Sequence, residues 1–342
     1  SKKIDIIYFH SLPHHNYYLF DYIDTSKIVI WWEWGYDVYL APRGIVPLLK
    51  LELYKEKTQE IIKRYKQGSS NLIDKIRKLL YRDDLTIIQK INLLCFKLMQ
   101  KKIIFESRKS QKDVISRVDY FTPVLPIEYD MMKDAVSFFR AKPFMLDCGP
   151  GLVPTEVFNS KLEPSNVLIG NSLTYENNHL DIFAILSCFV LSNNCKFIIP
   201  VSYGDAYGGV PENLEKISGM PPDKTLWLKT FIPQEAYRKI FEGVSHAVFG
   251  HIRQQAMGNI FLCLRNGIKV YLYKDSIAYK QLKRWGYYVY TIDSELNQSS
   301  LDNCLTYEQA YHNYVLAVRR KENIRERTEK ELSEIFVKSA KK

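Results

Sequence analysis

The chain has 342 residues, of which 46% are hydrophobic and 25% charged, so it is too long for one ordinary hydrophobic core and we expect a globular protein of two domains. It has no run of about 20 apolar residues that could span a membrane and no signal-peptide-like start, which favours a soluble or peripheral protein. None of the six cysteines lies in a Cys-x-x-Cys pair or at metal-ligand spacing, which fits a reducing cytoplasm. The net charge of +10 comes from positions 48 to 112, which hold 17 Lys and Arg against 7 Asp and Glu.

This basic region has two interpretations that the sequence supports about equally. It is either the solvated face of a set of helices or a surface attracted to anionic lipid headgroups, where each well-placed cation contributes about 1 kcal/mol. Nucleic acid is a weaker alternative, because aromatic residues are few here and the chain contains no readable nucleic-acid-binding module. We therefore expect no nucleic-acid partner.

The pattern of apolar residues in the first half of the chain predicts an N-terminal Rossmann-like domain over 1–150. Two short apolar runs flank a helical pattern, which is a βαβ unit, and a basic amphipathic helical insert follows over about 47–112. Only about three strands are visible and the sequence begins without Met, which leaves open that an N-terminal piece is missing. The expected elements are a strand at Ile4–His10, a helix at Tyr17–Ile23, a strand at Lys27–Trp32, a strand at Val118–Val124 and a helix at about Tyr129–Arg140.

A stretch rich in Pro and Gly, Lys142–Pro164, is the best candidate for the domain boundary. Beyond it strands and helices alternate, which predicts a parallel, Rossmann-like domain over 160–310 and then a charged helical tail over 311–342. The expected strands are Val167–Gly170, Lys196–Val201, His246–Phe249, Lys269–Tyr273 and Tyr287–Thr291. The expected helices are Asn178–Leu191, Gln234–Glu242, Asn259–Arg265 and Ser276–Trp285.

One strand-to-helix junction carries the most chemical information. An apolar strand stops at Gly250, and a basic, amide-rich turn leads into a helix. Such a turn offers free backbone N–H groups and the positive end of a helix dipole, and Arg253 adds a forked cation that suits two phosphate oxygens. The predicted ligand is a diphosphate. The candidate residues of this turn are His251, Arg253, Gln254, Gln255, Gly258 and Asn259.

Two further strand ends in the same half carry short polar side chains. Gly170 permits close approach of a backbone, Asn171 and Ser172 offer hydrogen-bond donors, and His179 stands in the first helical turn beyond them. The alternative is ordinary helix capping by Ser172, Asn177 or Asn178. Because the carboxyl ends of parallel strands open onto one crevice, we expect these residues to join the Arg253 turn, together with Ser202 and Tyr203 after the next strand.

Taken together, these motifs resemble the bacterial 4-acetamido-4,6-dideoxygalactose (Fuc4NAc) transferases of enterobacterial common antigen synthesis, glycosyltransferase family 56. The resemblance covers residues from about 6 to 290, and Trp32, Glu33 and Tyr36 differ from the residues expected in that family. The motifs that carry it are Gly170-Asn171-Ser172, Asn178-His179-Leu180, Pro200 to Gly204, Arg253-Gln254-Gln255 with Gly258, and the aromatic segment Trp31 to Tyr39.

The resemblance implies a GT-B glycosyltransferase, with two Rossmann-like domains facing a cleft. It implies a dTDP-linked deoxyamino sugar as donor and a polyprenyl-diphosphate-linked saccharide as acceptor, in cell-surface polysaccharide synthesis. It also implies a peripheral enzyme on the cytoplasmic face of the bacterial inner membrane, held to anionic lipid by the basic insert. No metal cofactor is expected, because no DxD motif is evident and a helix N-terminus with Arg253 can neutralise the departing diphosphate.

In a glycosyltransferase of this kind, a general base should come from the first domain, which is the acceptor side. Asp37 is the first choice, with Glu33 second and Glu128 third, and His10, Trp34 and Gly35 are placed on the acceptor side. The alternative is that this Trp-rich strand end belongs to the core.

Two other functions stay open at this point: a sugar-nucleotide epimerase or hydrolase with the GT-B fold, and a non-catalytic basic module that binds membranes. The sequence does not decide the sugar, the acceptor, the stereochemistry or the oligomeric state.

Overall fold

The computed structural model describes residues 5–40, 45–67, 86–89, 91–93, 95, 109–145, 158, 160–161, 163–192 and 194–340. The chain forms two compact units. The first unit comprises Ser1–Lys50, Lys63–Leu146 and Arg327–Lys342, and the second comprises Leu51–Ile62 and Asp147–Glu326. The division differs from simple halves of the chain, because a short piece of each half packs with the opposite unit.

The first unit is built on a four-stranded parallel sheet in the order β1-β2-β3-β4. The predicted βαβ unit is present, with a 3-10 helix as its crossover. The fourth strand was not predicted, because it has only two residues and ends in proline. The elements are β1 Ile6–His10, η1 His14–Asp21, β2 Ile28–Trp32, η2 Tyr36–Leu40, α1 Val46–Leu49, α2 Glu56–Gln67, α5 Gln111–Arg117, β3 Tyr120–Thr122, α6 Pro126–Ala135 and β4 Lys142–Pro143.

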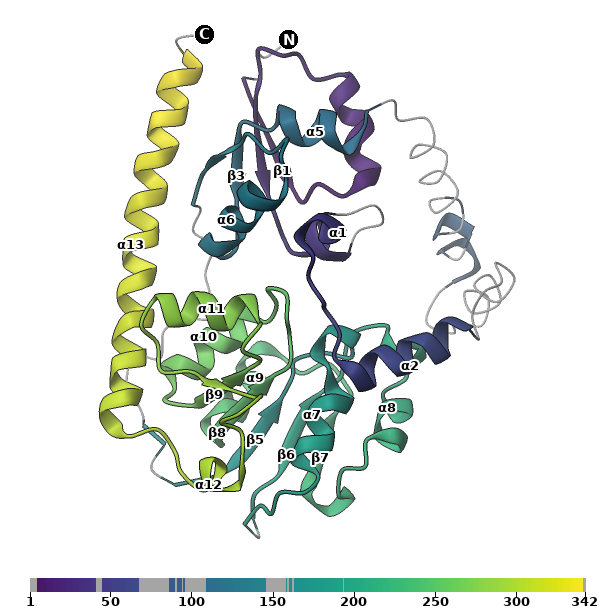
Figure 1. Ribbon diagram of the computed structural model, residues 1–342, viewed down its shortest axis with the longest axis vertical. Helices are drawn as coiled ribbons and strands as arrows, with labels where there is room; N and C mark the ends of the chain where they lie inside the picture. Colours follow the sequence, from purple (N-terminus) through teal and green to yellow (C-terminus); the bar gives the residue numbers. More distant parts are fainter. Residues whose placement is uncertain are drawn as a thin grey trace. The chain divides into compact units, whose positions relative to one another are not determined.

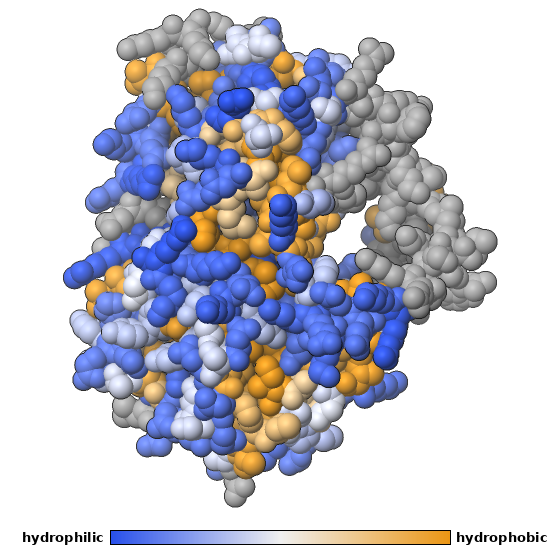
Figure 2. Space-filling model, viewed as in Figure 1, coloured by the Kyte–Doolittle hydropathy of each residue, from blue (hydrophilic) through white to orange (hydrophobic). Residues whose placement is uncertain are grey.

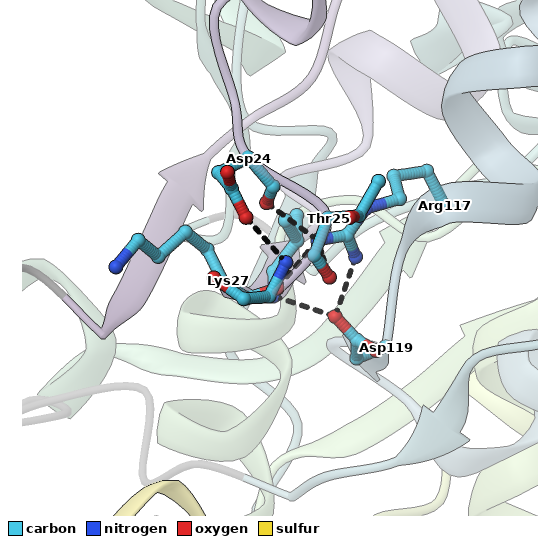
Figure 3. Close-up of polar contacts among 7 residues, drawn as sticks. Asp24, Thr25, Lys27, Arg117 and Asp119 are labelled. Carbon is cyan, nitrogen blue, oxygen red and sulfur yellow. Dashed lines mark hydrogen bonds and ion pairs between the residues drawn. The ribbon is translucent and has the colours of Figure 1, made fainter. Parts of the chain in front are cut away.

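A polar clamp fixes the amino end of this sheet (Figure 3). Arg117, the last residue of α5, donates to the backbone carbonyls of Asp24, Thr25 and Lys27 and pairs with Asp119 at 2.8 Å. Asp119 in turn accepts the backbone N–H of Val29 at 2.8 Å. The loop before β2 is therefore held to the loop before β3 by one guanidinium and one carboxylate.

The second unit is a six-stranded sheet in the order β10-β9-β8-β5-β6-β7, with every neighbouring pair parallel. Numbered from β5, this is the Rossmann order, and Figure 1 shows β5 between β8 and β6 at the point where the order reverses. The strands are β5 Asn166–Ile169, β6 Phe197–Pro200, β7 Thr225–Leu228, β8 Val244–Phe249, β9 Lys269–Leu272 and β10 Tyr290–Thr291. The helical elements are η3 Tyr175–Asn177, α7 His179–Leu186, η4 Ala206–Gly209, α8 Pro211–Ile217, η5 Pro222–Lys224, α9 Gln234–Glu242, α10 Met257–Arg265, α11 Ile277–Arg284 and α12 Gln298–Leu301.

Most predicted elements of this unit are present within one to five residues of their expected ends. The edge strand β7 and helix α8 were missed. The side chains of β7 are half-buried or exposed, as at the edge of a sheet, and its short apolar run Leu226-Trp227-Leu228 was overlooked.

The tail of the chain forms one long helix, α13 (Tyr307–Ala340), drawn in yellow in Figure 1. Within the described ranges no helix is long and apolar enough to cross a bilayer. Hydrophilic residues cover much of the face shown in Figure 2, with hydrophobic residues among them. Half of the predicted basic insert at 47–112 lies outside the described residues.

The two strands at the switch point of the second unit end in glycines that leave no room for a side chain. A Cβ on Gly170 would lie 2.5 Å from Asn177 Oδ1, and a Cβ on Gly250 would lie 2.2 Å from the backbone oxygen of Asn177. Gly170 also has a positive φ of +65°, which disfavours any other residue. The segment ending at Asn177 therefore lies directly over both strand ends.

We expect Gly250→Ala to lower the free energy of unfolding by about 1–3 kcal/mol, because the new methyl group must displace a backbone carbonyl. Denaturant unfolding followed by circular dichroism measures the change. Gly258→Ala is the matched control, because nothing lies within 4 Å of the Cβ position there. Equal stabilities for the two variants would contradict the close approach.

Candidate functional site

Side chains from three strand ends of the second unit form one hydrogen-bonded cluster, as the sequence predicted. Gln255 Nε2, after β8, donates to Asn171 Oδ1 at 3.2 Å and to Thr174 Oγ1 at 3.3 Å, both after β5. Asn171 Nδ2 donates to the hydroxyl of Tyr203, after β6, at 2.7 Å. The carboxyl ends of β5, β6 and β8 therefore meet at one polar site.

The centre of this cluster is Asn177. Its sequence position indicated only that it could cap a helix. Its Nδ2 donates to Ser172 O at 3.0 Å and to Thr174 Oγ1 at 2.9 Å, and its Oδ1 accepts the backbone N–H of Asn171 at 3.0 Å. Asn177 is fully buried. It holds the loop after β5 in shape, and its position before a predicted helix was the only sequence signal for it.

The amino end of α10 faces this cluster through an open turn. The residue before the helix, Ala256, adopts a left-handed backbone with φ +57° and provides no side-chain cap. Space around the Cβ position of Gly258, in the first turn, is open to at least 4 Å. A helix start of this kind presents N–H groups and the positive end of a dipole, so it attracts anions. Asn259 donates to the hydroxyl of Tyr237 at 3.2 Å.

Arg253 lies in this turn, but it is 9% exposed and does not project freely into solvent. Its Nη1 donates to the carbonyl of Gln254, itself 8% exposed, at 2.8 Å. The guanidinium is thus held close to the backbone that precedes α10. Such anchoring keeps a positive charge in a defined place, which favours a bound anion more than a mobile side chain would.

The two histidines predicted for the donor side are enclosed by protein. His179 stacks on Phe183 with ring centroids 5.5 Å apart, and burial lowers its pKa to about 3. His251 stacks on Phe249 at 6.2 Å, and its pKa is lowered mainly by burial and further by the charges of Arg253 and His179. Both imidazoles are therefore neutral at pH 7. Both rings have almost no exposed surface and are not presented to solvent, although the sequence placed His179 and His251 among the candidate donor-site residues. Ser202, by contrast, is exposed.

In the first unit, Asp37 is enclosed and fully engaged. Its Oδ2 accepts the backbone N–H of Leu12 at 2.8 Å and the indole N–H of Trp31 at 2.6 Å, and its Oδ1 accepts the N–H of Trp34 at 3.1 Å. Its exposure is 3%. Asp37 therefore joins the loops after β1 and β2, and this geometry favours a structural role over the general base for which it was the first choice.

Glu33 and Glu128 are also buried, at 0% and 2% exposure. Glu33 accepts the N–H of Gly35 at 2.6 Å, and Glu128 accepts the hydroxyl of Tyr39 at 2.5 Å. Burial first, and then the charges of Glu128 and Asp37, raise the pKa of Glu33 well above its usual value. A raised pKa keeps the Glu33 carboxyl protonated to higher pH, which lowers the cost of burying it beside two other carboxyls. None of the three predicted bases presents a carboxylate to solvent.

An exposed aromatic surface lies at the carboxyl ends of β1 and β2. The exposed ring of His10 lies 4.9 Å from Tyr8 and 4.9 Å from Trp32, and Trp34, 51% exposed, lies 4.8 Å from Trp32. Gly35 has φ +83° and turns the chain there. The predicted acceptor-side residues His10, Trp34 and Gly35 are thus neighbours. Among the residues described, no three His, Cys, Asp or Glu side chains gather as metal ligands.

Asp37→Asn should lower the free energy of unfolding by about 1–3 kcal/mol, because an amide nitrogen would replace an oxygen that accepts buried N–H groups. Denaturant unfolding monitored by tryptophan fluorescence reports the change, since Trp31 and Trp34 contact this carboxylate. Asp134→Asn, at an exposed position, is the control. Unchanged stability with lost activity would support the catalytic-base hypothesis instead.

The raised pKa of Glu33 predicts a pH dependence of stability. Above the pKa of the unfolded state the unfolded chain loses this proton while the folded chain keeps it, so stability falls as pH rises toward the folded-state pKa. Replacing Glu33 with Gln should flatten this fall, because an amide does not titrate. Thermal unfolding between pH 4.5 and 8.5 tests this, and identical profiles for the two proteins would show that Glu33 ionises normally.

No protein-family model matches the sequence, and no curated protein matches it. Solved structures do match. The trehalose-6-phosphate synthase OtsA is 11% identical with a TM-score of 0.50, over 92% of this chain and 73% of that one. A trehalose-6-phosphate synthase from Burkholderia multivorans is 8% identical with a TM-score of 0.50, over 98% and 96% of the two chains.

A third match is the E. coli protein described as trehalose-6-phosphate bound with UDP-2-fluoro glucose. It is 14% identical, has a TM-score of 0.47 and aligns with 69% of this chain, which spans 63% of its length. The likeness to the two synthases, together with the two parallel sheets, establishes that the chain has the GT-B fold with two Rossmann-like domains.

Proposed function

We propose that this protein is a glycosyltransferase that binds a nucleotide-sugar donor in its second unit. The observation that carries the proposal is the meeting of three strand ends, an open helix start and Arg253 at the switch point of a Rossmann sheet, where such folds bind nucleotides. The two solved structures at a TM-score of 0.50 are trehalose-phosphate synthases, which supports sugar transfer as the activity.

The chemistry follows from charge. In the transfer, the bond between the anomeric carbon and the diphosphate oxygen breaks, an acceptor hydroxyl oxygen bonds to that carbon, and the hydroxyl proton passes to the departing diphosphate or to solvent. Negative charge grows on the departing diphosphate. The guanidinium of Arg253 and the amino end of α10 are fixed beside each other before the reaction, so they stabilise that charge without reorganising.

For the donor, we propose a dTDP-linked deoxyamino sugar of the Fuc4NAc type, and for the acceptor a polyprenyl-diphosphate-linked saccharide. The resemblance of the Asn171-Ser172 and Arg253-Gln254-Gln255 turns to the Fuc4NAc transferases supports both. The aromatic surface around Trp34 suits the apolar face of a sugar ring, which favours the acceptor role assigned to it.

For the location, we propose peripheral attachment to the cytoplasmic face of the bacterial inner membrane through the basic region at 48–112. A lipid-linked acceptor has to be met at the membrane surface, which is the reason for this proposal. Metal-independent transfer is part of the same proposal, because Arg253 and the start of α10 already supply positive charge.

Nucleotide binding tests the function directly. Addition of the correct nucleoside diphosphate at 100 times its Kd should stabilise the protein by about 2.7 kcal/mol, seen as a rise in melting temperature. We expect dTDP to exceed UDP and GDP. Arg253→Ala should weaken this binding about 10- to 100-fold, because a charged hydrogen-bonding group is removed.

Arg140→Ala, at an exposed position of the first unit, is the control and should bind normally. Stabilisation by none of the three nucleotides would overturn the proposal, and equal stabilisation of the Arg253 variant would remove Arg253 from the site. Donor consumption without any acceptor would favour a hydrolase or epimerase.

A further inference from the structure

A segment from the first half of the sequence is built into the second unit. This segment, Leu51–Ile62, which we call the strap, belongs to the second unit, whereas the residues on both sides of it belong to the first. It includes the start of α2. Its partners lie about 120 residues further along the chain, so local sequence patterns contain no sign of the association.

The strap is anchored through the side chain of Asp181, in the first turn of α7. Its two oxygens accept the backbone N–H of Lys57 at 2.9 Å, the N–H of Thr58 at 3.1 Å and the hydroxyl of Thr58 at 2.6 Å. The first N–H groups of any α-helix lack partners within the helix. The carboxylate of Asp181 accepts two of these unpaired N–H groups at the start of α2. The second unit therefore determines where α2 begins.

A second anchor, Asn178, links the strap to the proposed donor site. Asn178 is fully buried in a left-handed conformation with φ +50°. Its Oδ1 accepts the N–H of Lys55 at 2.8 Å, and its Nδ2 donates to Leu53 O at 3.2 Å and to Gly250 O at 2.7 Å. Gly250 directly follows β8 and lies three residues before Arg253. The amide side chain of Asn178 therefore binds both the strap and the Arg253 turn.

A third contact reaches the end of β9. The ammonium of Lys55 lies 4.5 Å above the ring of Tyr273 and 3.6 Å from Asp275 Oδ2. The strap thus contacts residues that follow β5 and β9 and shares Asn178 with β8. It lies along the carboxyl edge of the sheet, where the proposed donor binds.

The strap carries Tyr54 into this edge. The hydroxyl of Tyr54 donates to Glu176 Oε1 at 3.2 Å, and Glu176 is 6% exposed. Burial and then the charge of Glu176 raise the pKa of Tyr54, whereas the nearby charge of Arg253 lowers it. Tyr54 therefore stays protonated and lies close to both an acidic and a basic group.

We propose that the strap is a wall of the donor site and that Tyr54 is a positioning residue, whose hydroxyl holds the Glu176 carboxylate so that it does not compete with the diphosphate for Arg253. The inference rests on the proposed function, because it assumes a nucleoside diphosphate at Arg253. A buried carboxylate that loses its hydrogen-bond donor gains most by pairing with a cation. Asn178 Nδ2 donates to Glu176 O at 3.3 Å and to Gly250 O at 2.7 Å. It thereby joins Glu176 to the turn whose cation is Arg253.

Two variants and one control test the proposal by titration with the nucleoside diphosphate that stabilises the wild type. Tyr54→Phe should raise the Kd about 5- to 10-fold, because Glu176 then pairs with Arg253. Adding Glu176→Gln to Tyr54→Phe should restore the Kd to within about 2-fold of the wild type, because the competing charge is gone. In turnover, Tyr54→Phe should raise the donor KM more than it lowers kcat.

Tyr22→Phe, at a position 84% exposed in the first unit, is the control and should keep the wild-type Kd. Hydrogen exchange of the strap should slow when the nucleotide binds the wild type, and Asp181→Asn should speed it in the free protein. A wild-type Kd in Tyr54→Phe, or no rescue in the double variant, would overturn the strap proposal while Arg253→Ala still loses binding. A wild type that binds no nucleotide would overturn the proposed function and this inference with it.

Discussion

The second unit depends on a close contact between backbone atoms. The carbonyl of Asn177 lies where a Cβ on Gly250 would be, and its side chain lies where a Cβ on Gly170 would be. Because two neighbouring strands end in glycine, the chain after β5 can cross directly over the switch point. The crossing then places Asn171 and Ser172 against Gln255 from the other strand, and it sets α10 and Arg253 beside them. The proposed donor site exists because no side chain occupies that space.

The first unit uses acidic side chains differently. Three carboxyls are buried at the ends of β2 and α6, and each accepts hydrogen bonds from backbone or aromatic donors. Their interactions hold an aromatic loop in place, so that Trp34 remains exposed while Trp31 is 1% exposed. Acidic residues at a strand end suggest catalysis when read from sequence. Here the oxygens of these carboxyls accept hydrogen bonds from buried groups, which indicates that they hold the aromatic surface around Trp34 in place. The exposed aromatic rings are the part of this surface that a ligand can reach.

The Arg253 turn could be predicted because its signal is local: an apolar strand, a glycine, a basic turn and a helix follow one another within a dozen residues. The strand ends at Asn171 and Tyr203 could be added, because parallel strands place their carboxyl ends on one edge. The strap could not be found, since Tyr54 and its partner Glu176, like Thr58 and its partner Asp181, are more than a hundred residues apart and meet only through folding. The burial of His179 was likewise missed, because helical position alone does not show what packs over a ring.

The resemblance to a known family implied the two-domain GT-B organisation. The sequence patterns by themselves determined the alternation of strands and helices and the turn that suits a diphosphate. These follow from hydrophobic periodicity and from the backbone preferences of glycine, which act over short distances. The tertiary structure alone decided which polar groups are accessible. It enclosed Asp37, Glu33, His179 and His251, exposed Trp34, and brought the strap to the donor edge. Burial and long-range hydrogen bonds depend on the whole fold, and no local pattern encodes them.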